Sequence, residues 1–302
     1  MPPLFLTGAS GFVGRRVLRL LARTDYSDVR LLSRDPDRLA ASGALPPSWR
    51  AVPGSLTEPD AWAEHLQGVE TVVHLAAATG KVRAKVHLEV NLEGTRHLLE
   101  RARQAGIRRF LFVSSIAVTY RHRPHYHYAA AKSAAEALVQ SSGMNWLIVR
   151  PTVVLGPGSP ALLSLRRLAL LPVPLLFGRG EQPVQPIHVE DLARLLVAAL
   201  AIERWGGHAI EAGGPETLTL EELLVRIRAA RKPGHARFRH LPLKPTRLAL
   251  GVLEPILLPL LPFSAGQLAL FANPSVAASD AFLAQLPAPT LGIAEMLAEA
   301  GE

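Results

Sequence analysis

Short, continuously apolar segments alternate with segments of helical periodicity along the first half of the chain. The apolar segments, each predicted to form a strand, are residues 3–6, 29–33, 50–53, 71–77, 109–115 and 145–151. Val13, Val17, Leu20 and Leu21 lie between the first two and recur at the spacing of one helix face. Strands that are apolar at every position are typical of a parallel sheet covered on both faces. The pattern therefore predicts an α/β fold built on a Rossmann-type, doubly wound parallel sheet.

Further helices are predicted from the same periodicity and from capping signals. Their ranges are 57–66, 90–106, 128–142, 192–200, 219–227 and 290–300. Thr57 is the expected N-cap of the first helix and Gly106 the expected stop of the second, and Thr219 with Glu222 has the pattern of a capping box. The alternation loosens after Pro151. We expect a Rossmann domain over residues 1–155, and over residues 156–302 a small substrate lobe together with elements that return to the sheet.

Composition narrows the function classes. The chain has 302 residues, no cysteine and a formal net charge of +8, so disulfides and thiolate sites are excluded and anionic ligands are favoured. The arginines are scattered instead of following one helix, and we therefore expect no nucleic-acid partner. The N-terminal residues lack the pattern of a signal peptide, which favours a cytoplasmic protein. The sequence leaves open whether the protein is a monomer or a homodimer.

Residues 248–263 form a very apolar stretch. It is shorter than the roughly 20 residues of a membrane-spanning helix and contains Glu254 and three prolines. We expect it to be buried or to form part of the lobe. Contact with a membrane surface is the alternative.

The sequence TGASGFVG, residues 7–14, joins the first predicted strand to the first predicted helix. Glycines in such a turn allow the backbone to approach a pyrophosphate closely, and the helix N-terminus adds free N–H groups and a positive dipole end. The position of Gly8, Gly11 and Gly14 at the start of a βαβ series therefore predicts a nucleotide-binding turn.

The glycine spacing resembles that of the extended and atypical short-chain dehydrogenases/reductases, which include the NAD-dependent epimerase/dehydratase type. The segments HLAA, FVSS, YAAAK, RPTVVLGPG and PIHVEDLA, which begin at residues 74, 112, 128, 150 and 186, extend the resemblance along most of the chain. It is weakest after Gly234. The resemblance implies a Rossmann domain, a small substrate lobe and a bound dinucleotide. The implied cofactor-binding residues are Gly8, Ser10, Gly11, Phe12, Val13, Gly14, Ser33, Arg34, Ser55, Leu56, Leu75, Ala76, Ala77, Tyr128, Lys132, Pro151 and Val154.

The end of the second predicted strand bears on the choice of dinucleotide. An acidic residue there would bind the ribose 2′-OH of NAD, whereas an arginine accommodates the 2′-phosphate of NADP. Ser33 and Arg34 occupy this place, so NADP(H) is favoured and NAD(H) is the alternative. Asp35 could turn toward the ribose in the NAD case. Ser55 stands where relatives carry an aspartate that faces the adenine.

Tyr128 and Lys132 are four residues apart on the predicted Ala-rich helix and so share one face. An ammonium group stabilises phenolate, which would lower the tyrosine pKa and let Tyr128 act as acid or base. Ser115 ends the fifth predicted strand, at the sheet edge where ligands of such folds bind. The resemblance identifies Ser115, Tyr128 and Lys132 as the catalytic residues.

Other polar residues have structural interpretations. His122, His125 and His127 lack the spacing of a metal site and fit a polar loop near the active site, where His127 could touch the substrate. His188, Glu190 and Asp191 are expected to shape the lobe and cap the next helix. Four arginines are candidates for binding an anionic group of the substrate: Arg166, Arg167, Arg179 and Arg237.

Three hypotheses about function follow. The first is an NAD(P)-dependent oxidoreductase that transfers a hydride to or from a carbonyl or hydroxyl carbon of a small, anionic or neutral molecule. The second is a nucleotide-sugar epimerase or dehydratase. The third is a nucleotide-binding protein without catalysis. The overall pattern, including the late segment QLALFANPSVAASDAF at residues 267–282, also resembles the nucleotide-binding accessory subunit of respiratory complex I and its bacterial relatives.

Overall fold

A single seven-stranded parallel sheet forms the centre of the computed structural model, which describes residues 1–302 except 42–44, 233, 235–236, 258–263, 265 and 300–302. The strand order is β11-β6-β5-β4-β1-β2-β3. The bounds are β1 Leu4–Thr7, β2 Val29–Ser33, β3 Arg50–Pro53, β4 Thr71–His74, β5 Arg109–Val113, β6 Asn145–Pro151 and β11 His208–Ala212. The order reverses between β1 and β4, which is where doubly wound folds bind their ligands. The predicted fold class is confirmed.

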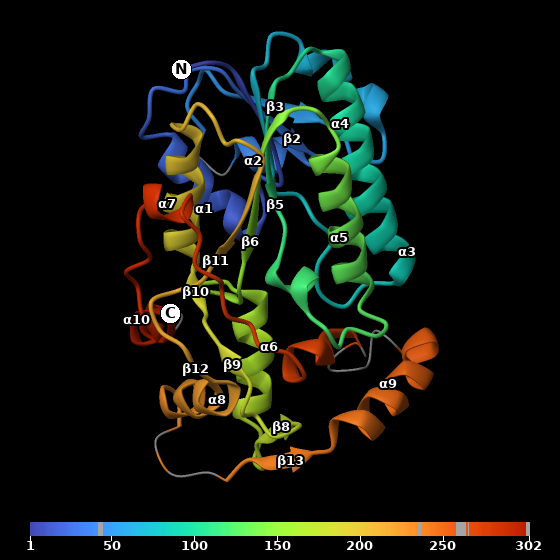
Figure 1. The fold of residues 1–302 in the computed structure, drawn as a ribbon, viewed down its shortest axis with the longest axis vertical. Coiled ribbons are helices and arrows are strands. Elements are labelled where there is room, and N and C mark those ends of the chain that lie inside the picture. Colours follow the sequence, from blue (N-terminus) through green and yellow to red (C-terminus); the bar gives the residue numbers. More distant parts are fainter. Residues whose placement is uncertain (42–44, 233, 235–236, 258–263, 265, 300–302) are drawn as a thin grey trace.

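Helices cover both faces of this sheet (Figure 1). On one face α1 (Phe12–Leu21) packs beside α7 (Val189–Leu200), and their apolar sides share a core with β1 and β2. On the other face α4 (Gly94–Gln104) and α5 (His127–Gln140) bury leucine, valine and alanine side chains against β4, β5 and β6. The sheet is thus buried on both sides, which accounts for its continuously apolar strands.

Two predicted helices differ from the observed structure. Residues 57–66 form two short 3₁₀ turns, η1 (Pro59–Ala61) and η2 (Ala63–Leu66), instead of one α-helix. The fully buried Trp62 donates its indole N–H to the carbonyl of Ser55 at 2.7 Å, which holds the segment against β3. The Thr57 hydroxyl pairs with that of Ser55 at 2.9 Å, and Thr57 is not the N-cap.

The helix predicted over residues 90–106 is broken near its start. A short helix α3 (Ala84–His87) leads into a π-helical segment η3 (Leu88–Glu93), and α4 follows. π-Helical turns are rare and often mark functional positions. Here the Thr95 hydroxyl donates to the carbonyl of Asn91 at 2.8 Å, while the Asn91 side chain accepts from the N–H of Ala78 in the segment that follows β4.

The remaining elements form a second layered unit at the carboxyl edge of the sheet. It contains α6 (Pro160–Ala169), α8 (Leu220–Ala229) and α10 (Ile293–Glu299), which surround a separate apolar core. Three two-stranded sheets accompany them: β7 (Val154–Leu155) with β10 (Ile187–His188), β9 (Pro183–Val184) with β12 (Leu218–Thr219), and β8 (Leu175–Phe177) with β13 (Arg239–Leu241). The predicted capping box is confirmed, because Thr219 caps α8 and Glu222 completes the reciprocal bond.

The apolar stretch predicted over residues 248–263 is described in part. Residues 248–257 belong to the helix α9 (Leu243–Leu257), and residues 258–263 lie outside the described part of the chain. Among the described residues, no helix has the length and hydropathy that crossing a membrane requires. The short elements that complete the chain are α2 (Pro36–Ala40), η4 (Ile116–Thr119), η5 (Gly266–Phe271) and η6 (Leu283–Gln285).

Candidate functional site

The glycine turn fits tightly between β1, β4 and α1. Gly8 has φ +81°, and a Cβ added there would lie 2.5 Å from the backbone nitrogen of Ala76. A Cβ on Gly14 would lie 2.1 Å from the carbonyl oxygen of Gly8. Both positions therefore exclude any side chain, and the turn takes a shape that only glycine permits.

The N-terminus of α1 lies at this turn without a side-chain cap. Gly11 is the N-cap residue, and the first turn of the helix contains no acidic residue. Ser10 is exposed, and Phe12 and Val13 are partly exposed. Uncapped N–H groups at a helix N-terminus beside a Gly-rich turn form a ready anion-binding site. The geometry thus fits the pyrophosphate of a dinucleotide.

The end of β2 presents Arg34 as an exposed side chain beside the buried Ser33. The Ser33 hydroxyl donates to the carbonyl of Asp35 at 2.9 Å and accepts from the Asp35 N–H. The Asp35 carboxylate caps α2 by accepting from the N–H of Arg38 at 3.0 Å. Asp35 is therefore engaged in its own helix, and the nearest charge at this strand end is positive. Ser55, half-buried, follows β3 at the same edge.

Buried polar side chains next to the glycine turn are hydrogen-bonded to one another in a row. The Thr7 hydroxyl accepts from the N–H of Ala76 at 3.3 Å and lies 2.7 Å from Nδ1 of His74. The His74 Nε2 lies 2.9 Å from the Thr95 hydroxyl, which itself donates to the Asn91 carbonyl. Because the Thr95 hydroxyl already donates its proton to Asn91, it accepts from His74, and Nε2 therefore carries the ring proton. Nδ1 then accepts a hydrogen bond from the Thr7 hydroxyl. Burial, with a smaller effect of Lys132, holds the pKa of His74 well below its usual range, so the ring is neutral.

This polar chain fixes the segment that follows β4. Asn91 accepts from the N–H of Ala78 at 2.7 Å and donates to the carbonyl of Ala78 at 2.9 Å. Residues 75–78, which include the implied cofactor contacts Leu75, Ala76 and Ala77, are partly exposed along this edge. Asn91 of the π-helical segment η3 thus holds the segment after β4, and Thr95 of α4 holds His74 at the end of β4.

Ser115, Tyr128 and Lys132 come from two elements beside this edge. Ser115 is the N-cap of η4 and accepts from the N–H of Ala117 at 3.2 Å, and its hydroxyl also hydrogen-bonds to Tyr128. Lys132 is 1% exposed, donates to the carbonyl of Val113 at 2.7 Å and lies 3.8 Å from the centre of the Phe112 ring. The structure therefore places Ser115 close enough to Tyr128 to affect its pKa, and Lys132 lies one helical turn further along α5.

The electrostatics of Tyr128 differ from the expectation that Lys132 lowers its pKa. Burial raises the pKa of Tyr128 to about 12, while the hydrogen bond from Ser115 opposes part of that effect. Burial lowers the pKa of Lys132 to about 7, and the carboxylate of Glu136 opposes that shift. The physical reason is that burial disfavours the charged form of each group, phenolate for Tyr128 and ammonium for Lys132. The Lys132 ammonium also donates to a backbone carbonyl, that of Val113. Tyr128 is consequently protonated at neutral pH.

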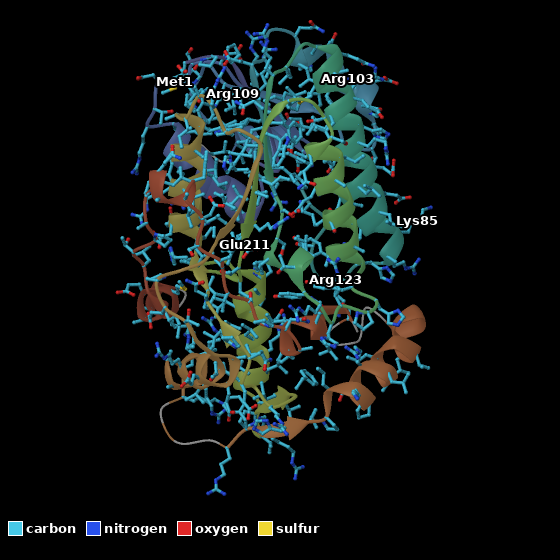
Figure 2. The ribbon with its side chains drawn as sticks, viewed as in Figure 1. Met1, Lys85, Arg103, Arg109, Arg123 and Glu211 are labelled. Carbon is cyan, nitrogen blue, oxygen red and sulfur yellow. The ribbon has the colours of Figure 1, made fainter. Side chains whose placement is uncertain are left out.

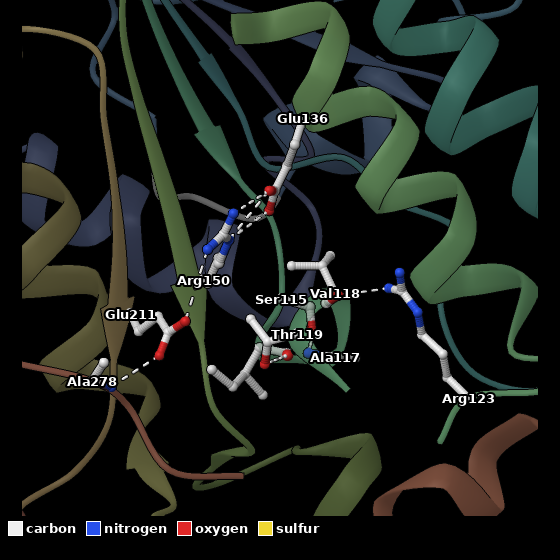
Figure 3. A network of polar contacts seen from close by, with 10 residues as sticks. Ser115, Ala117, Val118, Thr119, Arg123, Glu136, Arg150, Glu211 and Ala278 are labelled. Carbon is white, nitrogen blue, oxygen red and sulfur yellow. Dashed lines mark hydrogen bonds and ion pairs between the residues drawn. The ribbon is translucent and has the colours of Figure 1, made fainter. Parts of the chain in front are cut away.

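Figure 3 shows a network of ion pairs behind this face of α5. Glu136, one turn beyond Lys132, is 4% exposed and accepts two bonds from Nε of Arg150 and one from Nη2 at 2.6 Å. Arg150 also lies 3.8 Å from Glu211, whose other oxygen accepts from the N–H of Ala278 at 2.9 Å. The network connects α5, β6, β11 and the late segment around Ala278. In Figure 2, Glu211 lies toward the middle of the molecule, where sheet and lobe meet.

The segment that precedes Tyr128 packs against η5. Asn273, 1% exposed, accepts from the N–H of His122 at 3.0 Å and donates to its carbonyl at 2.8 Å. A Cβ on Gly266 would lie 2.6 Å from the His125 carbonyl and 2.9 Å from Cα of Tyr126. The Tyr126 ring lies 5.8 Å from that of Tyr128. The late part of the chain therefore shapes the loop that carries Tyr128.

The other polar candidates fall into two groups. His188 caps α7 by accepting from the N–H of Glu190, and Asp191 accepts from the N–H groups of Thr290 and Leu291, so this set stabilises the fold as expected. His122 and His125 are exposed on the loop before α5, and His127 is exposed as the first residue of α5. No group of three or more potential metal ligands occurs within the described residues.

The four candidate arginines do not share one element. Arg166 and Arg167 lie on α6, Arg179 forms an exposed ion pair with Glu181, and Arg237 is exposed before β13. Pro151 ends β6 and is buried, and Val154 begins β7 and pairs with Ile187. Leu56 is buried under α4.

Sequence reasoning missed the polar residues that hold the site from behind. His74, Asn91, Glu136, Arg150 and Asn273 were not singled out by motif chemistry. One signal was available for His74, since an imidazole in an otherwise apolar, fully buried strand requires partners. No comparable signal pointed to Asn273, because its partner His122 is 151 residues away.

Comparison with known proteins places most of the chain in one group. The model of the NAD dependent epimerase/dehydratase family matches residues 4–213. A ceramide reductase of Caulobacter vibrioides is 37% identical over 198 residues, which are 64% of this chain and 59% of that protein. A UDP-glucose 4-epimerase of Vibrio cholerae is 31% identical over 226 residues, 65% of this chain and 66% of that protein. The matches thus span about 60% of the length of these two relatives.

A solved structure extends the likeness to the whole chain. The UDP-glucuronic acid 4-epimerase of Bacillus cereus, in complex with UDP-glucuronic acid and NAD, superposes with a TM-score of 0.75 over 99% of this chain and 97% of that one. The sequence identity is 20%, so this likeness concerns the fold.

Proposed function

Because the chain belongs to the NAD-dependent epimerase/dehydratase family, we propose that it is an oxidoreductase that reduces a carbonyl group to a hydroxyl with NADPH. The observation that carries the proposal is the grouping of Ser115, Tyr128 and Lys132 at the edge of the sheet that also holds the glycine turn and the uncapped N-terminus of α1. When bound, a nicotinamide dinucleotide supplies the hydride.

Tyr128 is the proton donor in this proposal. Its raised pKa, about 12, keeps the phenol protonated at neutral pH, as donation to the oxygen of a reduced carbonyl requires. Ser115 hydrogen-bonds to Tyr128 and offers its hydroxyl to the same substrate oxygen. Lys132, one helical turn along α5, donates to the carbonyl of Val113, and in this proposal its ammonium binds the ribose of the dinucleotide.

The two relatives bear on the class of substrate. The ceramide reductase relative supports reduction of a ketone, and its substrate suggests a lipid for this chain as well. The UDP-glucose 4-epimerase relative favours the second candidate, an epimerase acting on a nucleotide sugar through a transient ketone. The absence of a long insertion between Ser115 and Tyr128 favours simple reduction on a smaller or more open site.

The experiment that tests the proposal measures NADPH oxidation with a panel of long-chain and short-chain ketones. We expect turnover by the natural chain and a loss of about 10²–10⁴-fold in kcat for Tyr128→Phe, the range for removal of a general acid. NADPH binding, followed by fluorescence titration, should be unchanged. Tyr26→Phe removes a phenol from the opposite end of the Rossmann half and serves as the matched control.

Other outcomes point to the alternatives. Epimerisation of a nucleotide sugar without net NADPH consumption supports the epimerase. Nucleotide binding without turnover, equal in Tyr128→Phe, supports a non-catalytic role and overturns the proposal.

The preference for NADP(H) rests on Arg34 and on the engagement of Asp35 as a helix cap. Arg34→Ala should weaken NADPH binding about tenfold or more, because an arginine–phosphate pair is lost, and should leave NADH binding within about twofold. Arg103→Ala, an exposed arginine on α4 (Figure 2), is the control. Equal losses for both dinucleotides, or none, contradict this preference.

A further inference from the structure

The excess of basic over acidic residues is concentrated in one segment. Residues 226–253 contain eight basic residues and no acidic one, so the rest of the chain holds 25 basic and 25 acidic residues. Within this segment Lys232, Arg237, Arg239 and Lys244 are exposed. The net charge of +8 is therefore a property of the stretch from α8 through β13 into α9, while the remainder is neutral.

The helix that ends this segment presents apolar side chains to the outside. Leu248 is 72% exposed and Val252 67%, and they follow the exposed Lys244 at successive helical turns. Leu253, 41% exposed, lies beside them. The other side of α9 packs inward through Leu243 and Leu250. A solvated helix has the opposite pattern, with its polar residues outward.

Neighbouring elements extend this exposed apolar surface. Val173 is 56% exposed and Leu171 37%, both in the turn between α6 and β8. β8 pairs with β13, and β13 leads directly into α9. Figure 1 shows α9 extending away from the body of the lobe, next to the end formed by β8 and β13. Exposed apolar residues and basic residues thus occupy one end of the molecule.

We propose that this basic, apolar end of the lobe, comprising α9 with the β13 segment before it, docks on the surface of an anionic lipid bilayer. Lysine and arginine side chains attract anionic headgroups, and leucine and valine side chains enter the boundary between headgroups and acyl chains. The helix lies in the plane of that boundary. The described helices do not span a membrane, so the docking is peripheral.

Charge and hydropathy together favour a bilayer over other partners. The phosphates of a nucleic acid would pair with the basic residues but would leave Leu248 and Val252 in water. A second copy of the chain would have to offer acidic residues, while the chain outside this segment is neutral overall. A bilayer interface satisfies both kinds of side chain at once.

The docking surface is connected to the candidate site. α9 contacts η5, and η5 packs through Gly266 against His125 and Tyr126, immediately before Tyr128. A bound membrane would therefore lie near the element that positions the loop before Tyr128. The docking itself does not depend on the proposed reductase activity.

The test is co-sedimentation of the full chain with vesicles. We expect binding to vesicles that contain phosphatidylglycerol, weak binding to pure phosphatidylcholine, and a loss of binding at high salt. Lys244→Glu combined with Arg239→Glu should weaken binding about tenfold or more. Leu248→Ser combined with Val252→Ser should do the same. These side chains are exposed, so thermal unfolding should stay unchanged.

Leu88→Ser and Arg103→Glu change an exposed leucine and an exposed arginine in the Rossmann half and are the matched controls. Three outcomes overturn the proposal. They are absence of binding to anionic vesicles, binding that survives the leucine–valine change, and a dimer, seen by sedimentation, that the same change dissociates while vesicles remain unbound.

Discussion

At the scale of the residue, Lys132 is the most unusual group in the protein. Its ammonium is almost fully buried, with a backbone carbonyl and an aromatic ring as its nearest partners. Burial lowers its pKa to about 7, so it titrates in the range where an enzyme works. Burying this ammonium lowers the stability of the folded protein. Such strongly perturbed groups are common at sites that act on a substrate or cofactor.

This burial predicts a pH dependence of stability for the protein without nucleotide. Between about pH 7 and pH 10.5 the unfolded chain binds a proton at Lys132 that the folded chain does not bind. The free energy of unfolding should therefore rise with pH across this window. The cost of burying a charged Lys132 is complete below its folded-state pKa of about 7 and disappears toward its unfolded-state pKa of 10.5. Urea unfolding at several pH values should show a smaller slope for Lys132→Met. Lys85→Met, at an exposed lysine, should keep the slope of the natural chain. Equal slopes in the natural chain and both variants would contradict the lowered pKa of Lys132.

At the scale of the element, α5 organises the candidate site through its periodicity. Tyr128, Lys132 and Glu136 lie on one face, and Glu136 fixes that face to β6 through Arg150. Irregular helices lie around this face: Asn91 of η3 holds Ala78, Ser115 caps η4 beside Tyr128, and Gly266 of η5 packs against His125 and Tyr126. Irregular helices thus provide the fine placement, and regular ones provide the frame.

The capping box of α8 allows a prediction at this scale. Thr219→Ala removes the acceptor for the Glu222 N–H and should lower the free energy of unfolding by about 1 kcal/mol. Ser164→Ala removes a hydroxyl from the interior of α6 and should change it by less than about 0.5 kcal/mol. Chemical denaturation measures both. An equal loss of unfolding free energy in the two variants would mean that the Thr219–Glu222 capping box contributes no more than any helical hydroxyl group.

At the scale of the whole molecule, the last third of the chain completes the candidate site. Ser275 pairs with Pro183 and Gln185, Ala278 bonds to Glu211 on β11, and Asn273 holds His122 near the start of α5. The sheet provides the glycine turn and the end of β4, but the loop before Tyr128 has its shape only with η5 in place. Lobe and sheet are therefore joined by hydrogen bonds on both sides of the candidate site.

Asn273→Ala tests this connection. It leaves the backbone of His122 without its partner, and we expect a loss of about 1–3 kcal/mol in stability. Amide exchange should increase in residues 120–127 and stay unchanged in the glycine turn. Turnover should fall while dinucleotide affinity is retained. The exposed Gln104→Ala is the control, and unaltered exchange in residues 120–127 would argue against the role of Asn273.

The sequence by itself determined the sheet, the glycine turn and the helical face that carries Tyr128 and Lys132. These features depend on local periodicity and on short-range spacing, which a single chain records directly. The helix predicted over residues 57–66 was wrong because the buried Trp62, bonded to Ser55, outweighed the local helical signals. The continuous helix over residues 90–106 was wrong because Asn91 bonds to Ala78 after β4, while Thr95 bonds to His74 on β4 and back to Asn91.

Only the tertiary structure decided how the site is held and charged. The raised pKa of Tyr128 and the lowered pKa of Lys132 arise from burial, which spacing along the helix does not encode. The contacts of Asn273 with His122, of Arg150 with Glu211 and of His74 with Thr7 and Thr95 join residues that are distant in sequence. Such contacts form only when the folded sheet and lobe bring their elements together, and for this reason no local pattern predicts them.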